Sequence, residues 1–595
     1  MEETEKNERK REYGNAGRCS KARTKLKYAK KRRYHGKNKR KCVNNDNDNF
    51  SETQTSASNS TDKLAAKSTA SSSKVIDVDL PSSNQLNSKP TSSITGYRLV
   101  DMLILSKVFS LLGCPECHDV DCLKLNDNDE NKKGLARQLI LKCSSCLYSY
   151  DFYTSREVNL PKRNKGGRKL RDINVRAVYG CRQVGLGYQH LKKLCCFMNM
   201  PSPMLLNSFD KITKRLTTSA KQVAERSMSD AALKLRGNAA TADVGISIGG
   251  TWQRKGYTSM NGIITAISID NGKVLDSVIL SKNCKACTSK NLDKSTKKIS
   301  EDDYNDWYES HKVKCKLNHK GSSPAMETVG AETIFNRSVA KHQLYYTSFY
   351  GDGDSKAYPA VQHTYGPAKP VTKFECIGHY QKRVGSRLRK KKKDVKGLGG
   401  RGRLTDAKID ILQNYFGIAL RQNTGNLDKM VSATKASMYH VAGYHDNCPK
   451  DENSWCKFQL DKLNGTDTYK DKGGFPSDVR KAILPVYMDL CKPENLAKCL
   501  HGRTQNANES FNGMIWNRVP KANHVGVNIL SLGTYDAIAH FNEGAIAAIN
   551  ILKGVHIMQP GKYMREGLNL ISRERGNPLI AYPINRKKEE KSSET

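Results

Sequence analysis

The sequence lacks long apolar runs, and it has few acidic residues for its number of basic ones. No segment approaches the ~18–20 consecutive apolar residues that a membrane-spanning helix needs. The amino-terminal residues are polar and charged, without the apolar stretch of a secretory signal peptide. These absences argue against membrane insertion and against secretion.

The charge of the chain is strongly one-sided. Its 595 residues include 100 Lys and Arg against 59 Asp and Glu, which gives a net charge of +41 and a pI near 9.6. Such an excess favours a polyanionic partner, either nucleic acid or an acidic membrane surface. Because nothing in the sequence indicates membrane association, we expect DNA or RNA as the partner. The length allows about three or four domains.

Basic and polar tails flank the folded part of the chain. Residues 1–42 carry 17 Lys and Arg against 5 Glu, and residues 51–95 are rich in Ser, Thr and Asn. Such segments bury too little apolar surface to offset chain entropy, so we predict disorder over 1–96. Residues 571–595 form a second, charged tail. The basic blocks indicate nuclear localisation or a DNA-contacting arm, with a merely solubilising tail as the alternative.

Cysteine pairs predict a zinc ribbon over residues 97–160. The chain has 18 cysteines, and outside the secretory pathway paired Cys-x-x-Cys spacings more often mean zinc than disulfides. Cys114 and Cys117 form one such pair, and Cys143 and Cys146 form another after 25 intervening residues. Four thiolates leave no open metal position, so the predicted Zn²⁺ is structural. The alternative is a set of unliganded core cysteines.

Two further groups of residues have spacings that suit zinc. The first combines Cys284 and Cys287 with His311 and Cys315, and His319 is a spare ligand. Buried cysteines without metal are the alternative. The second group is incomplete and consists of three residues: His445, Cys448 and Cys456.

The pattern of apolar residues predicts a mixed α/β core. Residues 161–240 read as helical, either a DNA-binding region or a linker. From residue 241 the apolar period changes to two, which is typical of strands. We expect antiparallel strands near 244–252, 263–269 and 274–280, and another strand at 344–350. A sheet with acids at strand ends and a later glutamate on a helix fits a ribonuclease-H-like fold.

Acidic residues follow the last of these strands and open a late helix. Asp352 and Asp354 lie in a Gly-Asp-Gly-Asp turn, and Glu509 precedes an apolar helical face. Metal-assisted phosphoryl transfer uses two divalent cations held by about three carboxylates, and Mg²⁺ prefers oxygen ligands. Each acid by itself also fits a simpler structure, either a surface turn or a capped helix start.

A Cys-x-x-His motif stands at the head of the most basic segment of the core. Cys376 and His379 are followed by eleven Lys and Arg and one Asp over residues 382–403. Such a run would follow phosphates, and a solvated helix face is the alternative. Our candidates for DNA contact are Lys382, Arg383, Arg387 and Arg389.

Taken together, the order and content of these motifs resemble the Mutator-like DNA transposases. The resemblance extends over residues 97–560 and includes the zinc ribbon. It is carried by Gly250-Thr251-Trp252, the segment 321–327, Gly351-Asp352-Gly353-Asp354, Cys376-Ile377-Gly378-His379 with the basic residues after it, and Gln505-Asn506-Ala507-Asn508-Glu509.

The resemblance implies a fold and an activity. It implies a ribonuclease-H-like DDE core over 241–400, a helical insertion over 401–498 and core completion over 499–570. Asp352 (or Asp354) and Glu509 would hold catalytic Mg²⁺ or Mn²⁺ for DNA cleavage and strand transfer. The partners would be transposon terminal repeats and target DNA, bound in the nucleus by a homo-oligomer.

One position departs from the family pattern. Members commonly have an aspartate directly before the Gly-Thr-Trp motif, and this chain has Gly249 there. Asp243 lies roughly 20 Å away along an extended strand, so it cannot replace the missing carboxylate. The resemblance therefore predicts a transposase that is either active or silenced by this glycine. The alternative function is that of a transposase-derived nuclear DNA-binding protein.

Overall fold

The structure is a computed structural model, and it describes residues 96–158, 170–254, 258–353, 356–470, 474–558 and 561–574. The predicted tails lie almost entirely outside these ranges, so disorder over 1–96 stays a prediction. Asp354 also lies outside the described residues. No helix within the described ranges is long and apolar enough to cross a membrane.

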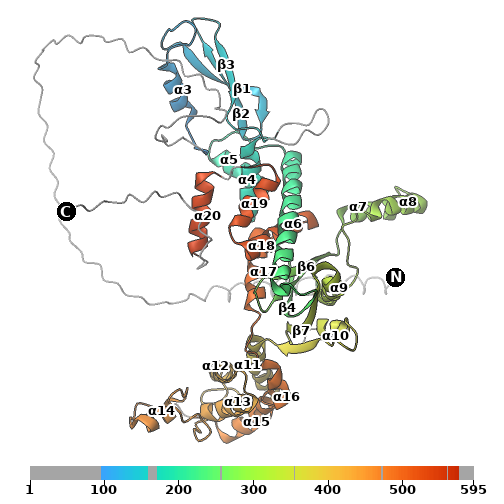
Figure 1. The fold of residues 1–595 in the computed structure, drawn as a ribbon, viewed down its shortest axis with the longest axis vertical. Helices are drawn as coiled ribbons and strands as arrows, with labels where there is room; N and C mark the ends of the chain where they lie inside the picture. The colour runs from blue at the N-terminus through green and yellow to red at the C-terminus, as the bar shows by residue number, and fades with distance from the viewer. Residues whose placement is uncertain are drawn as a thin grey trace, which may run out of the picture. The chain divides into compact units, whose positions relative to one another are not determined.

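The first folded segment is a small antiparallel sheet next to a helix (Figure 1). Its strands pair in the order β1-β2-β3, and its elements are α3 (Met102–Ser110), β1 (Leu123–Lys133), β2 (Ala136–Cys143) and β3 (Ser149–Tyr153). The buried side chains of Leu123 and Leu141 pack against the cysteines of this segment. The sheet therefore supports the predicted zinc ribbon.

The region predicted to be helical consists of three helices, which pack against helices from the end of the chain. They are α4 (Asp172–Gln183), α5 (Tyr188–Phe197) and α6 (Leu206–Arg236), and their partners are α18 (Val527–Glu543) and α19 (Ile546–Gly554). Phe209 and Leu216 of α6 are fully buried in this cluster together with Ile551. A last helix, α20 (Lys562–Glu574), follows.

A five-stranded mixed sheet forms the centre of the following region, which confirms the α/β class. Its order is β6-β5-β4-β7-β8. The pairs β4–β5 and β5–β6 are antiparallel, whereas the pairs β4–β7 and β7–β8 are parallel. The strands are β4 (Ala242–Trp252), β5 (Asn261–Ser268), β6 (Val274–Ser281), β7 (Leu344–Gly351) and β8 (Thr372–Glu375).

Helices cover both faces of this sheet. Because side chains alternate along a strand, Ile246 and Ile248 of β4 face α9 (Ala325–His342), where they pack in one cluster with Phe335. Ile263 of β5 belongs to the cluster on the other face, with Phe511 of α17 (Asn506–Arg518). Complete burial of each such side chain contributes about 1.5–3 kcal/mol. The short α10 (Ala357–Val361) follows β7.

Between β8 and α17 the chain forms a helical region with a core of its own. Its helices are α11 (Ile377–Asp394), α12 (Asp406–Gln422), α13 (Leu427–Val441), α14 (Lys457–Asn464), α15 (Ser477–Leu490), α16 (Pro493–Leu496) and the 3-10 turn η1 (Ala497–Cys499). Val384 of α11, Phe416 of α12 and Tyr487 of α15 are fully buried in one cluster. The basic helix α11 therefore packs on the helices that follow it.

A buried ion pair fixes α17 to its neighbours. The Nε of Arg518 lies 2.5 Å from Oδ1 of Asp536 on α18, and His540 Nδ1 lies 3.0 Å from the same oxygen. Tyr179 and Gln183 of α4 donate to the other carboxylate oxygen at 2.9 and 2.7 Å. Four side chains from three helices thus satisfy one buried carboxylate, as burial of a charge requires.

We expect Asp536→Ala to destabilise the packing of α17 by about 3–5 kcal/mol, because it leaves Arg518 charged and buried without its partner. Hydrogen exchange of the α17 amides measures the loss. The control is Asp489→Ala, which removes a carboxylate from exposed ion pairs and should cost no more than about 1 kcal/mol. Equal destabilisation by Asp536→Ala and Asp489→Ala would contradict the role of Asp536 as the buried partner of Arg518.

The same carboxylate predicts a dependence on pH. Burial alone would raise the pKa of Asp536, but His540 and Arg518 outweigh it and hold that pKa below its ordinary value. The contribution of the ionised carboxylate is therefore complete above the ordinary Asp pKa of about 3.9 and is lost as the pH falls below it. Protection of the α17 amides should decline in acid more steeply in the wild type than in Asp536→Asn.

Candidate functional site

The strands β4 and β7 bring the predicted acid and the unexpected glycine to the same level of the sheet. These strands are parallel and adjacent, and Ser247 pairs with Tyr350. The pairing ends there, two residues before Gly249 in one strand and two residues before Asp352 in the other. On the far side of β7, Gly351 pairs with Glu375, the last residue of β8. Three of the sequence motifs therefore meet at one edge of the sheet.

Gln505, at the start of α17, connects this edge to the later motifs. Its Nε2 donates to the carbonyl oxygens of Ile248 at 2.9 Å and Tyr350 at 3.3 Å. Its backbone N–H donates to Cys376 Sγ at 3.3 Å, and its Oε1 lies 2.9 Å from His379 Nδ1. One buried side chain thus contacts β4, β7 and the first turn of α11.

Glu509 follows one helical turn later, next to His379. Its Oε1 lies 3.6 Å from His379 Nε2, and 59% of its side chain is exposed. The hydrogen bond with Cys376 raises the pKa of His379, and the charge of Asp352 acts in the same direction. The imidazole is therefore in contact with Glu509, and the charge of Asp352 acts on its pKa.

Cys376 is buried beneath this imidazole. Burial alone would raise the pKa of Cys376, but the hydrogen bond from His379 outweighs it and lowers that pKa. Neither residue belongs to a group of metal ligands among the described parts of the chain. Their contacts are with each other, Gln505 and Glu509.

Arg383 occupies the side of the site next to Asp352. Its Nη2 lies 2.8 Å from Glu375 Oε2 and 3.6 Å from Asp352 Oδ1. A side chain at Gly353 would collide with this guanidinium, so the Arg383 side chain would have to move to admit one. The Glu375 side chain is almost buried, whereas 55% of the Asp352 side chain is exposed. Arg383 thus offsets the negative charge of both carboxylates.

Unpartnered polar atoms surround the position where the family has its aspartate. A Cβ on Gly249 would lie 2.9 Å from Asn508 Nδ2. Thr265 is the cross-strand partner of Gly249, and Ser247 lies two residues along the same strand, so both share its face. The Oγ of Ser247, the Oγ1 of Thr265 and the Oδ1 of Asn508 are buried without a hydrogen-bond partner. The environment of Gly249 is therefore polar, although Gly249 itself has no polar side chain.

Two other aspartates of the sheet do not compensate for Gly249. Asp243, at the start of β4, pairs with Lys369 at 2.7 Å. Asp276 lies on the edge strand β6 and is fully buried, paired with Arg337 at 2.7 Å and Lys341 at 2.8 Å. Its role is to join β6 to α9.

The other predicted DNA-binding residues lie along α11. Lys382 is exposed. Arg387 pairs with Asp489 at 2.7 Å, and Arg389 pairs with Asp410. Exposed ion pairs of this kind contribute about 1 kcal/mol or less, so a phosphate can replace the carboxylate. DNA contact by these residues stays a prediction.

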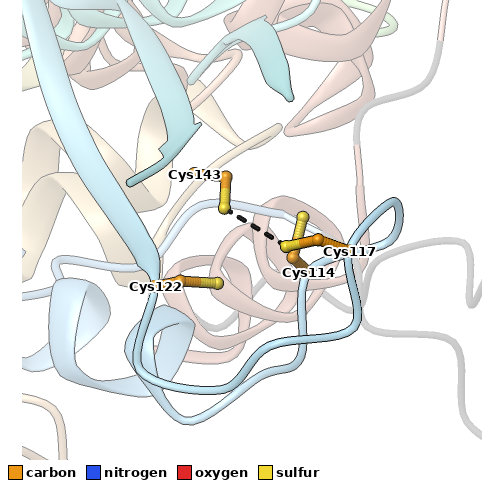
Figure 2. Close-up of side chains that lie close together, drawn as sticks. All are labelled: Cys114, Cys117, Cys122 and Cys143. Carbon is orange, nitrogen blue, oxygen red and sulfur yellow. Dashed lines mark hydrogen bonds between the residues drawn. The ribbon is translucent and has the colours of Figure 1, made fainter. Parts of the chain in front are cut away.

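Figure 2 shows the first cysteine cluster, in which Cys114, Cys117, Cys122 and Cys143 lie close together. Cys114 Sγ lies 3.6 Å from Cys146 Sγ, and Cys117 Sγ lies 3.7 Å from Cys143 Sγ. Zn–S bonds of about 2.3 Å at tetrahedral angles separate two sulfurs by ~3.8 Å. These two sulfur–sulfur distances suit a zinc ion, whereas Cys146 is not in the group of four cysteines whose sulfurs are all close to one another.

Cys122 is a fifth cysteine in this cluster, which the sequence analysis missed. Its Sγ and those of Cys114, Cys117 and Cys143 all lie within 4.8 Å of one another. Cys122 belongs to no Cys-x-x-Cys pair, so spacing gave no signal for it. Its Sγ also donates to the carbonyl oxygen of Asp119 at 3.0 Å. Cys122 and Cys146 are thus alternatives for the fourth zinc ligand.

The second predicted cluster is assembled at a helical hairpin formed by α7 (Lys285–Ser295) and α8 (Glu301–Lys312). Cys284 Sγ lies 3.3 Å from His311 Nε2, and Cys287 Sγ lies 3.5 Å from Cys315 Sγ. These four residues form one group that could hold a metal ion. The spare ligand His319 is not in it, because its ring bonds to the carbonyl oxygen of Ser322 at 2.9 Å.

Comparison with known protein families agrees with the resemblance that the sequence motifs carry. A family model described as Mutator-like transposase matches residues 96–456. The chain belongs to the Mutator-like transposase family. No curated protein matches the chain closely enough to count as a relative. The match includes the first cysteine cluster, the sheet, Asp352 and the Cys376–His379 motif, whereas Glu509 lies beyond it.

We expect Cys287→Ser to lower the zinc content of the purified protein by one ion per chain, because three ligands remain at that site. Mass spectrometry of the metal content measures the change. Cys195→Ser is the matched control: this thiol is also buried but lies outside the clusters, so the zinc content should not change. An unchanged zinc content in Cys287→Ser would contradict a metal site there.

Proposed function

We propose that this transposase-family protein binds transposon-end DNA through a ribonuclease-H-like core, and that Gly249 suppresses its DNA cleavage. The sheet supports the proposed fold, since three antiparallel strands are followed by two strands parallel to the first. Gln505, at the start of the late helix α17, contacts β4 and β7, and Glu509 follows one turn later, which supports this fold as well. Ribonuclease-H-like enzymes that cleave DNA have their carboxylates at this position.

The observation that carries the proposal is the convergence of separate motifs on one edge of the sheet. Asp352 and Glu509 are 157 positions apart in the chain, yet His379 lies within the influence of both. Gln505 holds this arrangement against the strand that contains Gly249. If Asp352 belonged only to a surface turn and Glu509 only to the capped start of a helix, these two residues would not need to lie near the same imidazole.

The residues present do not fit a pair of divalent cations. Two Mg²⁺ or Mn²⁺ ions need about three carboxylates, one of which bridges the metals. Gly249 offers no ligand, and Arg383 places positive charge 3.6 Å from Asp352. We therefore propose that this chain binds DNA but has little nuclease activity of its own. A fully active transposase is the second candidate, favoured by the retained Asp352 and Glu509.

Charge supports DNA as the partner. The net charge of +41 and the basic face of α11 provide the phosphate contacts of non-specific binding. Family membership adds transposon ends and target DNA as the specific ligands. Assembly as a homo-oligomer and a nuclear location are further parts of the proposal.

We expect Gly249→Asp to raise Mg²⁺- or Mn²⁺-dependent cleavage of terminal-repeat DNA by roughly tenfold or more, about 1.4 kcal/mol of barrier. The new carboxylate would share its face with Ser247 and Thr265, whose hydroxyls have no partner in the wild type. Asn508 Nδ2 must move by a few tenths of an ångström to admit the new side chain. A gel assay of labelled duplex ends measures cleavage.

Two controls separate charge from shape. Gly249→Asn has the same size without the charge and should stay at the wild-type level, and Gly249→Asp with Asp352→Ala should lose the gain. Strong wild-type cleavage that Asp352→Ala abolishes would refute the silenced site. DNA binding without cleavage in every variant would favour a protein that only binds DNA.

We expect Lys382→Ala with Arg387→Ala to weaken DNA binding for all sequences alike. Each lost phosphate contact lowers the slope of log K against log salt by about 0.9. Fluorescence anisotropy at several KCl concentrations measures both quantities. Lys221→Ala, an exposed lysine of α6, is the control. An unchanged slope in the double variant would place the DNA on another surface.

A further inference from the structure

We propose that His440, His445, Cys448 and Cys456 bind a zinc ion within the helical region between β8 and α17. The sequence indicated three of these residues as an incomplete group. The structure adds His440, which lies in the last turn of α13. All four side chains are buried, and their ligand atoms lie within 4.8 Å of one another.

The distances agree with a tetrahedral zinc ion. The two Nδ1 atoms of His440 and His445 lie 3.1 Å apart. Cys448 Sγ lies 3.5 Å from His440 Nδ1, and Cys456 Sγ lies 3.5 Å from His445 Nδ1. Zn–N bonds of about 2.0–2.1 Å and Zn–S bonds of about 2.3 Å give N–N and N–S separations of ~3.3 and ~3.6 Å. A single central ion satisfies all of these separations.

Hydrogen bonding without a metal explains the cluster less completely. One N–H···N bond can join the two imidazoles, but the thiols are weak donors and weak acceptors. A zinc ion would bind both nitrogens and both sulfurs at once. Four buried polar side chains directed at one point are therefore better satisfied by an ion than by one another.

Contacts around the cluster orient its histidines as ligands. Tyr469 Oη lies 3.1 Å from His445 Nε2, the nitrogen that faces away from the cluster. Gln459 Nε2 donates to the carbonyl oxygen of His445 at 2.7 Å. The ring of His440 lies 4.9 Å from that of Trp455 and 4.6 Å from that of Tyr415. Outer contacts of this kind fix the orientation and tautomer of metal-bound histidines.

The arrangement indicates a structural role. Four protein ligands leave no open coordination position for substrate or water. The ion would join the end of α13 to the start of α14, since Cys456 is the residue that caps α14. Between these helices the chain is irregular, so the metal supplies order that apolar packing does not. This function is separate from the proposed DNA chemistry.

Zinc counting on the full-length protein tests the site. His440→Ala and Cys448→Ser should each lower the zinc content by one ion per chain, whereas His440→Cys should retain it because a thiolate replaces the imidazole. Cys499→Ser is the matched control, a buried thiol of the same helical region outside the cluster. Unchanged zinc in both His440→Ala and Cys448→Ser would overturn the proposal.

A measurement on the unmodified protein covers the case in which the variants do not fold. Anomalous scattering at the zinc edge from crystals should give a peak among the four ligand atoms. Its absence, with peaks present at the other two clusters, would overturn the site. Either outcome leaves the proposed DNA binding and the Gly249→Asp experiment unaffected.

Discussion

The candidate site depends on one buried amide. Gln505 donates to carbonyl oxygens of two parallel strands and also contacts the thiol and the imidazole of the Cys-x-x-His motif. Backbone carbonyls near the end of a sheet need partners, and Gln505 supplies them from a helix. Because Glu509 follows one turn later on that helix, the hydrogen bonds of Gln505 also fix where the last acid lies.

The buried network around Asp536 and the space around Gly249 follow from the same packing. Arg518, the last residue of α17, joins this helix to α18. Asn508 and Gln505 hold the first turn of α17 against β4. Gly249 supplies no charge, and the pairing of β4 with β5 continues on both sides of it without a shift in register. The polar atoms around Gly249 are therefore still present, and the proposed loss of cleavage needs no loss of fold.

The clusters that could hold zinc have a different part in the architecture. The three clusters lie in irregular or short elements: the small sheet, the α7–α8 hairpin and the segment between α13 and α14. None of these has an apolar core as large as those of the central sheet or the helical region. Metal ligation, where the ligands are spaced as zinc requires, can stabilise such segments without a large core.

The sequence by itself determined the strands β4 to β7, the helical regions and the family, because apolar periodicity and short motifs are local properties. It did not determine the four-residue strand β8, which is too short to show a period. It also determined the ligands whose spacing is regular, such as Cys284 and Cys287. Only the tertiary structure decided that Arg383 faces Asp352, that Arg387 pairs with Asp489, and that Cys122 and His440 join clusters of ligands. Some of these contacts join residues from different elements, and others involve a residue that belongs to no spaced motif. No local pattern in the sequence encodes which distant side chain such a residue will contact.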